Sequence, residues 1–526
     1  MNRNVKEALN KSRHASCLHI FRNLARKLLE IHQVFLRRFH TILRKICLRN
    51  LHTRFNQHSL KKITALFLVG TMLAGCAQQE EKMDLIGETR DFSTEPETPA
   101  EPVIEPLAVA VYPEMAAYPD ERSYILDNGD WDSDGFDKAY NAWSSDRERQ
   151  REKGDAADYS EKLNSFFKAT APLLLSSENG ENSLYAPANI YMALSLLTEV
   201  TDGESRAQIL SLLGASDVSE QRKIAGALWN KNYCSDGALT SIIANSLWLR
   251  DDADYNTDTL GVLANDYYAS SYSGEMGSDY YDKALQDWTN YQTGGFLSDS
   301  VQGMHLDPET VLALVSTMYY RAKWSDEFSK SGTSKDTFHA ENGDVECDFM
   351  HMTSPRNYYY TDVFNAIQLG LIESGGMWLI LPDEGKTVGD VLENDKFYSL
   401  LSAPNDFTST HIKVELSMPK FDVKQNGEIS KQLAALGITD VFDSEKANFS
   451  PLKDDSDGLF LSQVQHSARV AADEEGVTAA AFTMMAACGT AMPPEEKVEF
   501  NLNRPFIFVI TDSDGAPLFA GTVNCP

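Results

Sequence analysis

The most informative pattern of apolar and polar positions lies near the C-terminal end of the chain. Apolar and polar residues alternate over part of Leu461–Asp473, as in a β-strand with one buried face. Regular pairing is expected to stop over the next three residues, which are Glu474, Glu475 and Gly476. A second apolar run begins at Pro505 and Phe506. The pattern therefore predicts a strand followed by a long exposed loop.

The first part of this loop has small side chains, at Val477, Thr478, Ala479, Ala480 and Ala481. In an extended conformation one face would carry only small residues, whereas Phe482 would lie on the opposite face. The segment can therefore enter a tight gap between two strands without overpacking it. The alternatives are an Ala-rich helix and a plain surface loop.

Residues 61–76 begin with two lysines, which precede an apolar run of about a dozen residues. This run is too short to cross a bilayer. It suits the core of a signal peptide. The run ends in Leu-Ala-Gly-Cys76, which resembles the lipobox of bacterial lipoproteins. The resemblance implies lipidation of Cys76 and a chain anchored to the bacterial outer membrane or cell surface, with its folded part extracellular or in the periplasm. The alternative is a cysteine that follows a buried helix by chance.

These patterns divide the chain into four parts. Residues 1–60 form a basic extension, which is interpreted as a gene-model artefact with translation starting near Leu60, or as a cytosolic amphipathic helix. Residues 61–76 are the lipoprotein signal peptide. Residues 77–158 form an acidic and aromatic linker and extension, whose aromatic part from Tyr118 to Asp158 is expected to pack on the domain or to form a helical cap. Residues 159–526 are long enough for one large core.

Charge excludes one class of partner. The formal net charge is −30, and residues 1–62 hold 15 Lys and Arg against two acidic residues, so the rest of the chain carries −43. A folded part with this charge repels nucleic acid and anionic lipid surfaces. We therefore expect no nucleic-acid partner.

The sequence offers little for catalysis or metal binding. It contains no CxxC pair, no HExxH, no GxSxG and no phosphate-binding glycine loop, so neither catalytic residues nor a metal or cofactor are expected. His466 and His351 lie in apolar, strand-like surroundings and are interpreted as buried core histidines. Seven cysteines are too few for a disulfide scaffold. Cys488 would lie in the exposed loop, either as an oxidisable thiol or as a small neutral residue that a protease accepts.

Several segments in order resemble the serpin family, over roughly residues 159–526. These segments are Asn182–Ile190, Ile243–Trp248, Thr317–Trp324 with Phe328, Met418–Phe421, and the hinge and loop described above. The resemblance implies an α+β serpin fold with three β-sheets surrounded by eight to nine helices and an exposed reactive-centre loop. It also implies inhibition of proteases: the loop is cleaved as a substrate, inserts into the main sheet and traps the acyl-enzyme.

The same resemblance places the cleaved bond. Counting from the hinge glycine gives Thr490 as the residue before the bond, whereas counting back from Pro505 and Phe506 gives Ala491. Thr490–Ala491 is taken as the reactive bond, and the neighbouring positions are Cys488, Gly489 and Met492. The loop has no Arg or Lys there, which argues against trypsin-like targets. Elastase-like and subtilisin-like serine proteases and papain-like cysteine proteases fit small residues.

Three groups of supporting residues follow from the resemblance. The hinge covers Glu474, Glu475, Gly476, Val477, Thr478, Ala479, Ala480 and Ala481. The breach at the top of the sheet comprises Trp324, Lys420 and Glu474, and the Lys420–Glu474 pair is expected within about 4 Å. The shutter comprises Ala186, Asn189, Ser316 and His466.

Some of these positions depart from the family pattern. Val477 and Thr478 stand where Thr or Ser and Glu are common, and Val477 is still expected to enter a sheet. Asn189 and Ser316 look exchanged relative to the usual shutter, which keeps a hydrogen-bonded cluster with His466 possible.

The sequence thus predicts a protease inhibitor and not an enzyme. Its expected partners are a covalently bound target protease and a membrane reached through the lipid on Cys76, and the protein is expected to be a monomer without cofactors. The alternative is a non-inhibitory serpin that acts as a binding or structural surface protein.

Overall fold

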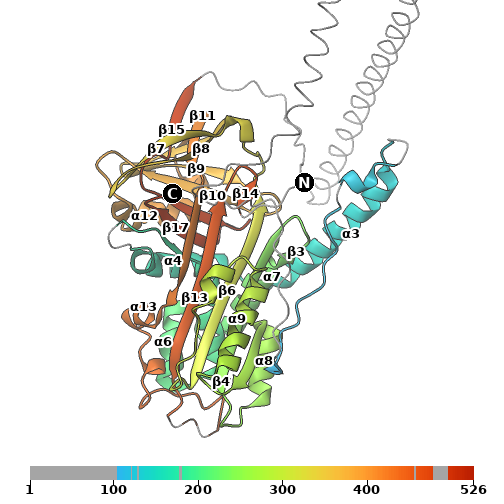
Figure 1. Ribbon diagram of the computed structural model, residues 1–526, viewed down its shortest axis with the longest axis vertical. Helices are drawn as coiled ribbons and strands as arrows, with labels where there is room; N and C mark the ends of the chain where they lie inside the picture. Colours follow the sequence, from blue (N-terminus) through green and yellow to red (C-terminus); the bar gives the residue numbers. More distant parts are fainter. Residues whose placement is uncertain are drawn as a thin grey trace, which may run out of the picture. The chain divides into compact units, whose positions relative to one another are not determined.

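Two β-sheets form the framework of the protein (Figure 1). The computed structural model describes residues 104–119, 121–126, 130–176, 180–454, 456, 458–477 and 496–526. The predicted signal peptide, its Cys76 and the basic extension lie outside these residues. Within the described part, no helix has the length and apolar character needed to cross a membrane.

The first sheet has the strand order β1-β5-β4-β6-β14-β13-β12, and β3 pairs with β4 at its side. Its strands are β1 Pro106–Ala108, β3 Cys234–Ser235, β4 Thr240–Arg250, β5 Ala269–Gly274, β6 Leu312–Lys323, β12 Phe421–Glu428, β13 Leu461–Ala472 and β14 Gly476–Val477. The strand predicted at Leu461–Asp473 is thus β13. It lies inside the sheet, so most of its side chains are buried, on both faces.

The second sheet has the order β15-β11-β8-β9-β10-β16-β17-β2, with β7 paired to β8. Its strands are β2 Ser183–Tyr185, β7 Ser334–Ala340, β8 Gly343–Tyr360, β9 Phe364–Gly370, β10 Gly376–Pro382, β11 Ser409–Pro419, β15 Lys497–Asn501, β16 Phe506–Thr511 and β17 Pro517–Val523. The long β8 pairs with β7 and β11 and reaches β9 at its end. This strand joins the second and third sheets of the expected three into one hydrogen-bonded sheet.

Helices cover both faces of the first sheet. The α-helices are α3 Ser133–Glu152, α4 Ser160–Leu174, α5 Pro187–Val200, α6 Gly203–Leu213, α7 Val218–Asn232, α8 Thr257–Asp266, α9 Asp279–Gln292, α10 Ser298–Val301, α11 Val388–Leu392, α12 Asp395–Ser402 and α13 Ser430–Ala435. Every residue of α5 is buried. Alternate residues of β6 belong to two cores: Leu314 packs into the main core that includes α5, and Val315 packs with Trp288 of α9. The expected α+β class, with β-sheets surrounded by helices, is confirmed, although the described residues form more α-helices than the eight to nine expected.

The segment before residue 159 packs on the domain, one of the two arrangements expected from its aromatic content. Strand β1 pairs with β5 at the edge of the first sheet. The Tyr112 ring lies 5.6 Å from the ring of Trp229. On α3, the Trp143 indole N–H donates to the buried Asp236 carboxylate at 2.8 Å. Because these aromatic contacts are desolvated, they hold the segment in place.

Candidate functional site in the first sheet

The two central strands of the first sheet diverge towards one end. Strands β6 and β13 are parallel, and their direct pairing ends with Thr317 opposite Ser467. Beyond that row β14 lies between them, with Val477 paired both to Ala322 of β6 and to Ala472 of β13. Figure 1 shows β14 at this upper end. We call the unpaired stretch between the two rows, residues 318–321 of β6 and 468–471 of β13, the strand gap.

Strand β14 is the beginning of the predicted loop. A Cβ on Gly476 would lie 2.3 Å from the Ala322 carbonyl oxygen, so only glycine can approach β6 this closely. Val477 is 1% exposed and belongs to the main core. The prediction that pairing stops through Gly476 is therefore wrong at that residue. Pairing resumes there because the Asp473 carboxylate accepts the N–H groups of Glu475 (2.9 Å) and Gly476 (3.1 Å), which turns the chain back into the sheet.

The breach residues meet at this turn. Lys420 Nζ lies 2.7 Å from Glu474 Oε2, so the predicted distance of 4 Å or less is confirmed. Thr333 Oγ1 donates to the other oxygen of the same carboxylate at 2.6 Å, a contact that no sequence pattern indicates. The indole N–H of Trp324 donates to the Asp473 carbonyl at 2.8 Å. Together these bonds fix the start of the loop to the top of the sheet.

Burial and hydrogen bonding act against each other on the two acidic groups of the turn. Burial favours the neutral form of Glu474, but the hydrogen bonds from Lys420 and Thr333 outweigh it and lower its pKa. Burial raises the pKa of Asp473, and the two backbone N–H groups it accepts only partly oppose this. Glu474 is therefore the ionised anchor of the hinge.

The shutter residues lie below the strand gap, where β6 and β13 still pair. His466 of β13 is 1% exposed and lies opposite Ser316 of β6. Its Nε2 accepts the Ala186 N–H at 3.3 Å, and its Nδ1 has no hydrogen-bond partner among the described residues. Burial lowers the pKa of His466 to about 4, so the ring is neutral at physiological pH.

Asn189 of α5 occupies the fork at which the strands part. With its amide oriented to satisfy both ends, the side chain donates to the Thr317 carbonyl (3.1 Å) and accepts the Thr317 N–H (3.2 Å). The hydroxyl of Ser316 lies 2.7–2.8 Å from the two ends of the same amide. The exchanged Asn and Ser thus do contact each other, whereas His466 bonds separately to the backbone of Ala186. The possible single cluster is divided into two.

The other end of the loop is also held by a strand. β15 runs parallel to β11, with Lys497 opposite Lys413. The ammonium of Lys497 lies 2.6 Å from the carboxylate of Glu415 on β11. The other predicted hinge residues and the predicted reactive bond lie outside the described residues: Thr478, Ala479, Ala480, Ala481, Cys488, Gly489, Thr490, Ala491 and Met492. The reactive bond therefore stays a prediction.

The two candidate core histidines differ in burial. His466 is a core residue, but the prediction for His351 is wrong, because its side chain is exposed and contacts Ser334 at 3.1 Å. Within the described part of the chain, no group of three or more His, Cys, Asp or Glu side chains is arranged to hold a metal ion. Cys234, Cys347 and Cys525 are unpaired thiols.

Comparison with known proteins assigns this arrangement to a family. The family model described as Serpin (serine protease inhibitor) matches residues 162–526. The chain is a serpin. This serpin is 27% identical over 365 residues to Serpin-Z1C of Triticum aestivum, covering 66% of the chain and 90% of the relative. It is also 27% identical over 367 residues to the leukocyte elastase inhibitor of Homo sapiens, covering 67% and 96%.

Solved structures agree on the fold. The thermophilic serpin tengpin in its native state superposes with a TM-score of 0.62 at 25% identity, covering 70% of this chain and 95% of tengpin. Arabidopsis AtSerpin1 in its native stressed conformation gives a TM-score of 0.61 at 22% identity, covering 70% and 99%. Serpins form complexes with target proteases. The family match begins at residue 162, so β1 and α3 lie before it.

Proposed function

We propose that this serpin is a suicide-substrate inhibitor, whose loop is cut at about Thr490–Ala491 and then inserts between β6 and β13. The strand gap supports this proposal most directly. Val477 already lies between Ala322 and Ala472, so the loop begins as a strand of the sheet. In the strand gap, residues 318–321 of β6 do not pair with residues 468–471 of β13. Both strands can therefore pair with further residues of the loop.

The register of β14 defines how insertion would proceed. Because β14 is antiparallel to β6, residues 478–481 would come to lie opposite residues 321–318. Val477 faces the main core, so Ala479 would follow on the same face, next to the buried Tyr320. These positions carry small side chains, which fit without displacing the core. Further insertion requires β6 to separate from β13 below Thr317.

Inhibition depends on a covalent intermediate and a race between two rates. The nucleophile of the protease attacks the carbonyl carbon of Thr490, the bond to the Ala491 nitrogen breaks, and the new amine leaves with the C-terminal fragment. The acyl-enzyme stays attached to the freed strand. Each backbone hydrogen bond gained on insertion adds about 0.5–1.5 kcal/mol, which drives displacement of the protease before water hydrolyses the ester or thioester. When insertion is slower than this hydrolysis, water cleaves the acyl bond, the protease is released, and the serpin remains as a cleaved product.

The loop composition supports a class of target protease, and the predicted lipidation of Cys76 supports a location outside the cytoplasm. Positions 478–492 contain no Lys or Arg and are rich in Ala, Thr and Met, which suits elastase-like or subtilisin-like serine proteases or papain-like cysteine proteases. We place the folded part outside the cytoplasm of a bacterial cell, as a monomer tethered through a lipid on Cys76.

Incubation with one protease of each class tests the proposal. We expect an SDS-resistant adduct with at least one of them and a released peptide that begins at or next to Ala491. The same protease with its nucleophile blocked is the control and should give no adduct. Complete cleavage of the loop without an adduct, and without a rise in the melting temperature of the cleaved protein, contradicts inhibition and favours the non-inhibitory alternative.

A further inference from the structure

A short loop after α9 spans the strand gap on the outer face of the sheet. Gly294 and Gly295 both have positive φ angles, +57° and +80°. A Cβ on Gly294 would lie 2.9 Å from the Tyr319 ring, so the glycine lets the loop rest directly on β6. The next side chain, Phe296, has its ring centre 6.4 Å from that of Tyr319.

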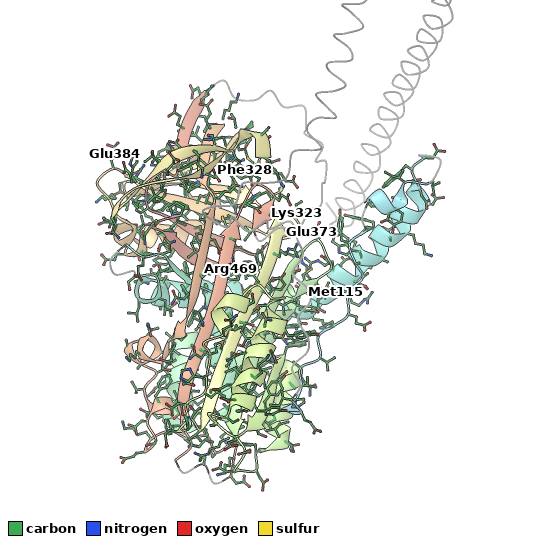
Figure 2. All side chains as sticks on the ribbon, viewed as in Figure 1. Met115, Lys323, Phe328, Glu373, Glu384 and Arg469 are labelled. Carbon is green, nitrogen blue, oxygen red and sulfur yellow. The ribbon has the colours of Figure 1, made fainter. Side chains whose placement is uncertain are left out.

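The same phenylalanine is held from the other side of the gap. The Arg469 guanidinium of β13 lies 4.2 Å from the centre of the Phe296 ring, and its Nη1 donates to the Phe296 carbonyl at 2.8 Å. Arg469 is 8% exposed and makes two further bonds to the Asp422 carboxylate of β12, at 2.8 and 2.6 Å. We call Tyr319, Phe296 and Arg469 the clasp. Figure 2 labels Arg469 on the face of β13 next to β6.

The clasp lies at one row of the gap. In the paired row below the gap Ser316 lies opposite His466, and in the row above it Ala322 and Ala472 flank Val477. The two rows have the same difference in residue number between β6 and β13. The same difference within the gap places Tyr319 across from Arg469. The two halves of the clasp therefore flank the position that an inserted residue would occupy. Phe296 connects them on the outer face.

Insertion and the clasp compete for this geometry. Adding a strand sets β6 and β13 about 9–10 Å apart along the whole gap, which is twice the spacing of neighbouring strands. The loop with Phe296 is anchored on the β6 side, because Leu297 and Trp288 are buried against Ala313 and Val315 of β6. Arg469 stays with β12 through Asp422. The hydrogen bond and the ring contact between Phe296 and Arg469 must therefore break when the gap widens.

We infer that the Phe296–Arg469 contact sets how fast this serpin's sheet admits a strand, and with it the partition between trapped protease and cleaved product. The inference rests on the proposed function. The contact stabilises the uninserted sheet and not the inserted one, so its loss lowers the barrier to insertion. Phe296 and Arg469 are positioning residues here, because they touch neither the protease nor the reactive bond.

The test measures insertion without a protease. A synthetic peptide with the sequence of residues 478–490 is incubated with the full chain, and the rate at which a heat-resistant complex forms is followed by native electrophoresis. Phe296→Leu keeps the apolar contact with Tyr319 and removes the ring below the guanidinium. We expect about 5–10-fold faster uptake, the factor that follows from a cation–π contact between the exposed and the fully desolvated cases. Arg469→Lys should accelerate uptake similarly, and the double variant should be no faster than either single one.

The control is Lys424→Gln, which removes a cation from β12 that lies 3.9 Å from Asp422 and leaves Phe296 untouched. Its uptake rate should equal that of the unmodified chain. If both Phe296→Leu and Arg469→Lys take up the peptide within twofold of that rate, the role of the clasp is overturned and the proposed function is unaffected. If the unmodified chain takes up no peptide and gains no heat resistance when its loop is cut, the proposed function fails first, and the inference fails with it.

Discussion

The side chain of Asn189 bonds both the N–H and the carbonyl of Thr317, at the last row where β6 pairs with β13. A side chain from α5 thus satisfies backbone groups of β6 at the fork where its neighbour strand departs. Buried backbone groups need such partners, because leaving them unpaired costs free energy. The Asn189 amide therefore stabilises the fork in the uninserted state.

Asn189→Ala should therefore destabilise the native protein by about 2–3 kcal/mol, because two buried backbone groups lose their partner. The measurement is the denaturation midpoint of the uncleaved protein. Ser316→Ala is the matched control, since it removes a hydroxyl next to the same amide and leaves the bonds to Thr317 in place. Equal losses in the two variants would show that the bonds to Thr317 carry no special weight.

His466 should make native stability depend on pH. Its folded pKa of about 4 lies below the ordinary value of 6.5, and burial is the cause. The unfolded chain therefore binds a proton that the folded chain excludes, so the stabilisation is full above about pH 6.5 and falls as the pH drops towards 4. The loss should reach about 2 kcal/mol at pH 5. Denaturation midpoints at pH 7 and pH 5 measure it.

The control for that experiment is His466→Gln, which cannot take up the proton. The difference between its midpoints at the two pH values should be smaller than that of the unmodified protein by the same amount. If both proteins lose stability equally between pH 7 and pH 5, another group is responsible and the assignment to His466 is wrong.

Local patterns in the sequence predicted the strands and the anchors of the site. The alternation at Leu461–Asp473 predicted β13, and the family motifs predicted that Lys420 meets Glu474, which the structure places 2.7 Å apart. Both depend on short segments with a strong signature. The two-residue period of a strand assigned Val477 to a face of small side chains, and the structure buries Val477 in β14.

The features of the site that the sequence does not predict depend on contacts between segments that are far apart along the chain. The pairing of Gly476 depends on how closely Ala322 of β6 approaches it. The apolar neighbours of His351 suggested burial, but β8 turns alternate side chains outward, so Met350 is buried and His351 is exposed. The contact of Arg469 with Phe296 joins two separate parts of the chain and has no local signature.

The hinge anchor gives a third prediction. The Glu474 side chain is 7% exposed and depends on Lys420 and Thr333 for its negative charge. Lys420→Gln should destabilise the native state by about 1–2 kcal/mol, because a buried carboxylate loses a charged partner. Thr333→Val, which removes a neutral donor to the same carboxylate, should cost less. The denaturation midpoints at pH 7 decide, and a larger effect of Thr333→Val would contradict the ion pair as the main anchor.

A charge placed at the first inserted residue should separate cleavage from inhibition. Val477 is 1% exposed between Ala322 and Ala472. In Val477→Glu the new carboxylate should leave this apolar row for solvent in the uncleaved protein, because burying it there costs several kcal/mol. Insertion would then have to desolvate it and should slow. We expect the loop to be cut at an unchanged rate while the yield of SDS-resistant adduct falls at least about tenfold.

The matched control changes charge at the opposite end of the loop. Lys497→Gln removes an exposed ammonium from β15 and should leave the adduct yield unchanged, because that strand keeps its pairing with β11. A normal adduct yield in Val477→Glu would mean that the protease is trapped without strand insertion between β6 and β13. In that case the covalent adduct would persist for a reason other than strand insertion, and the strand gap would have no part in inhibition.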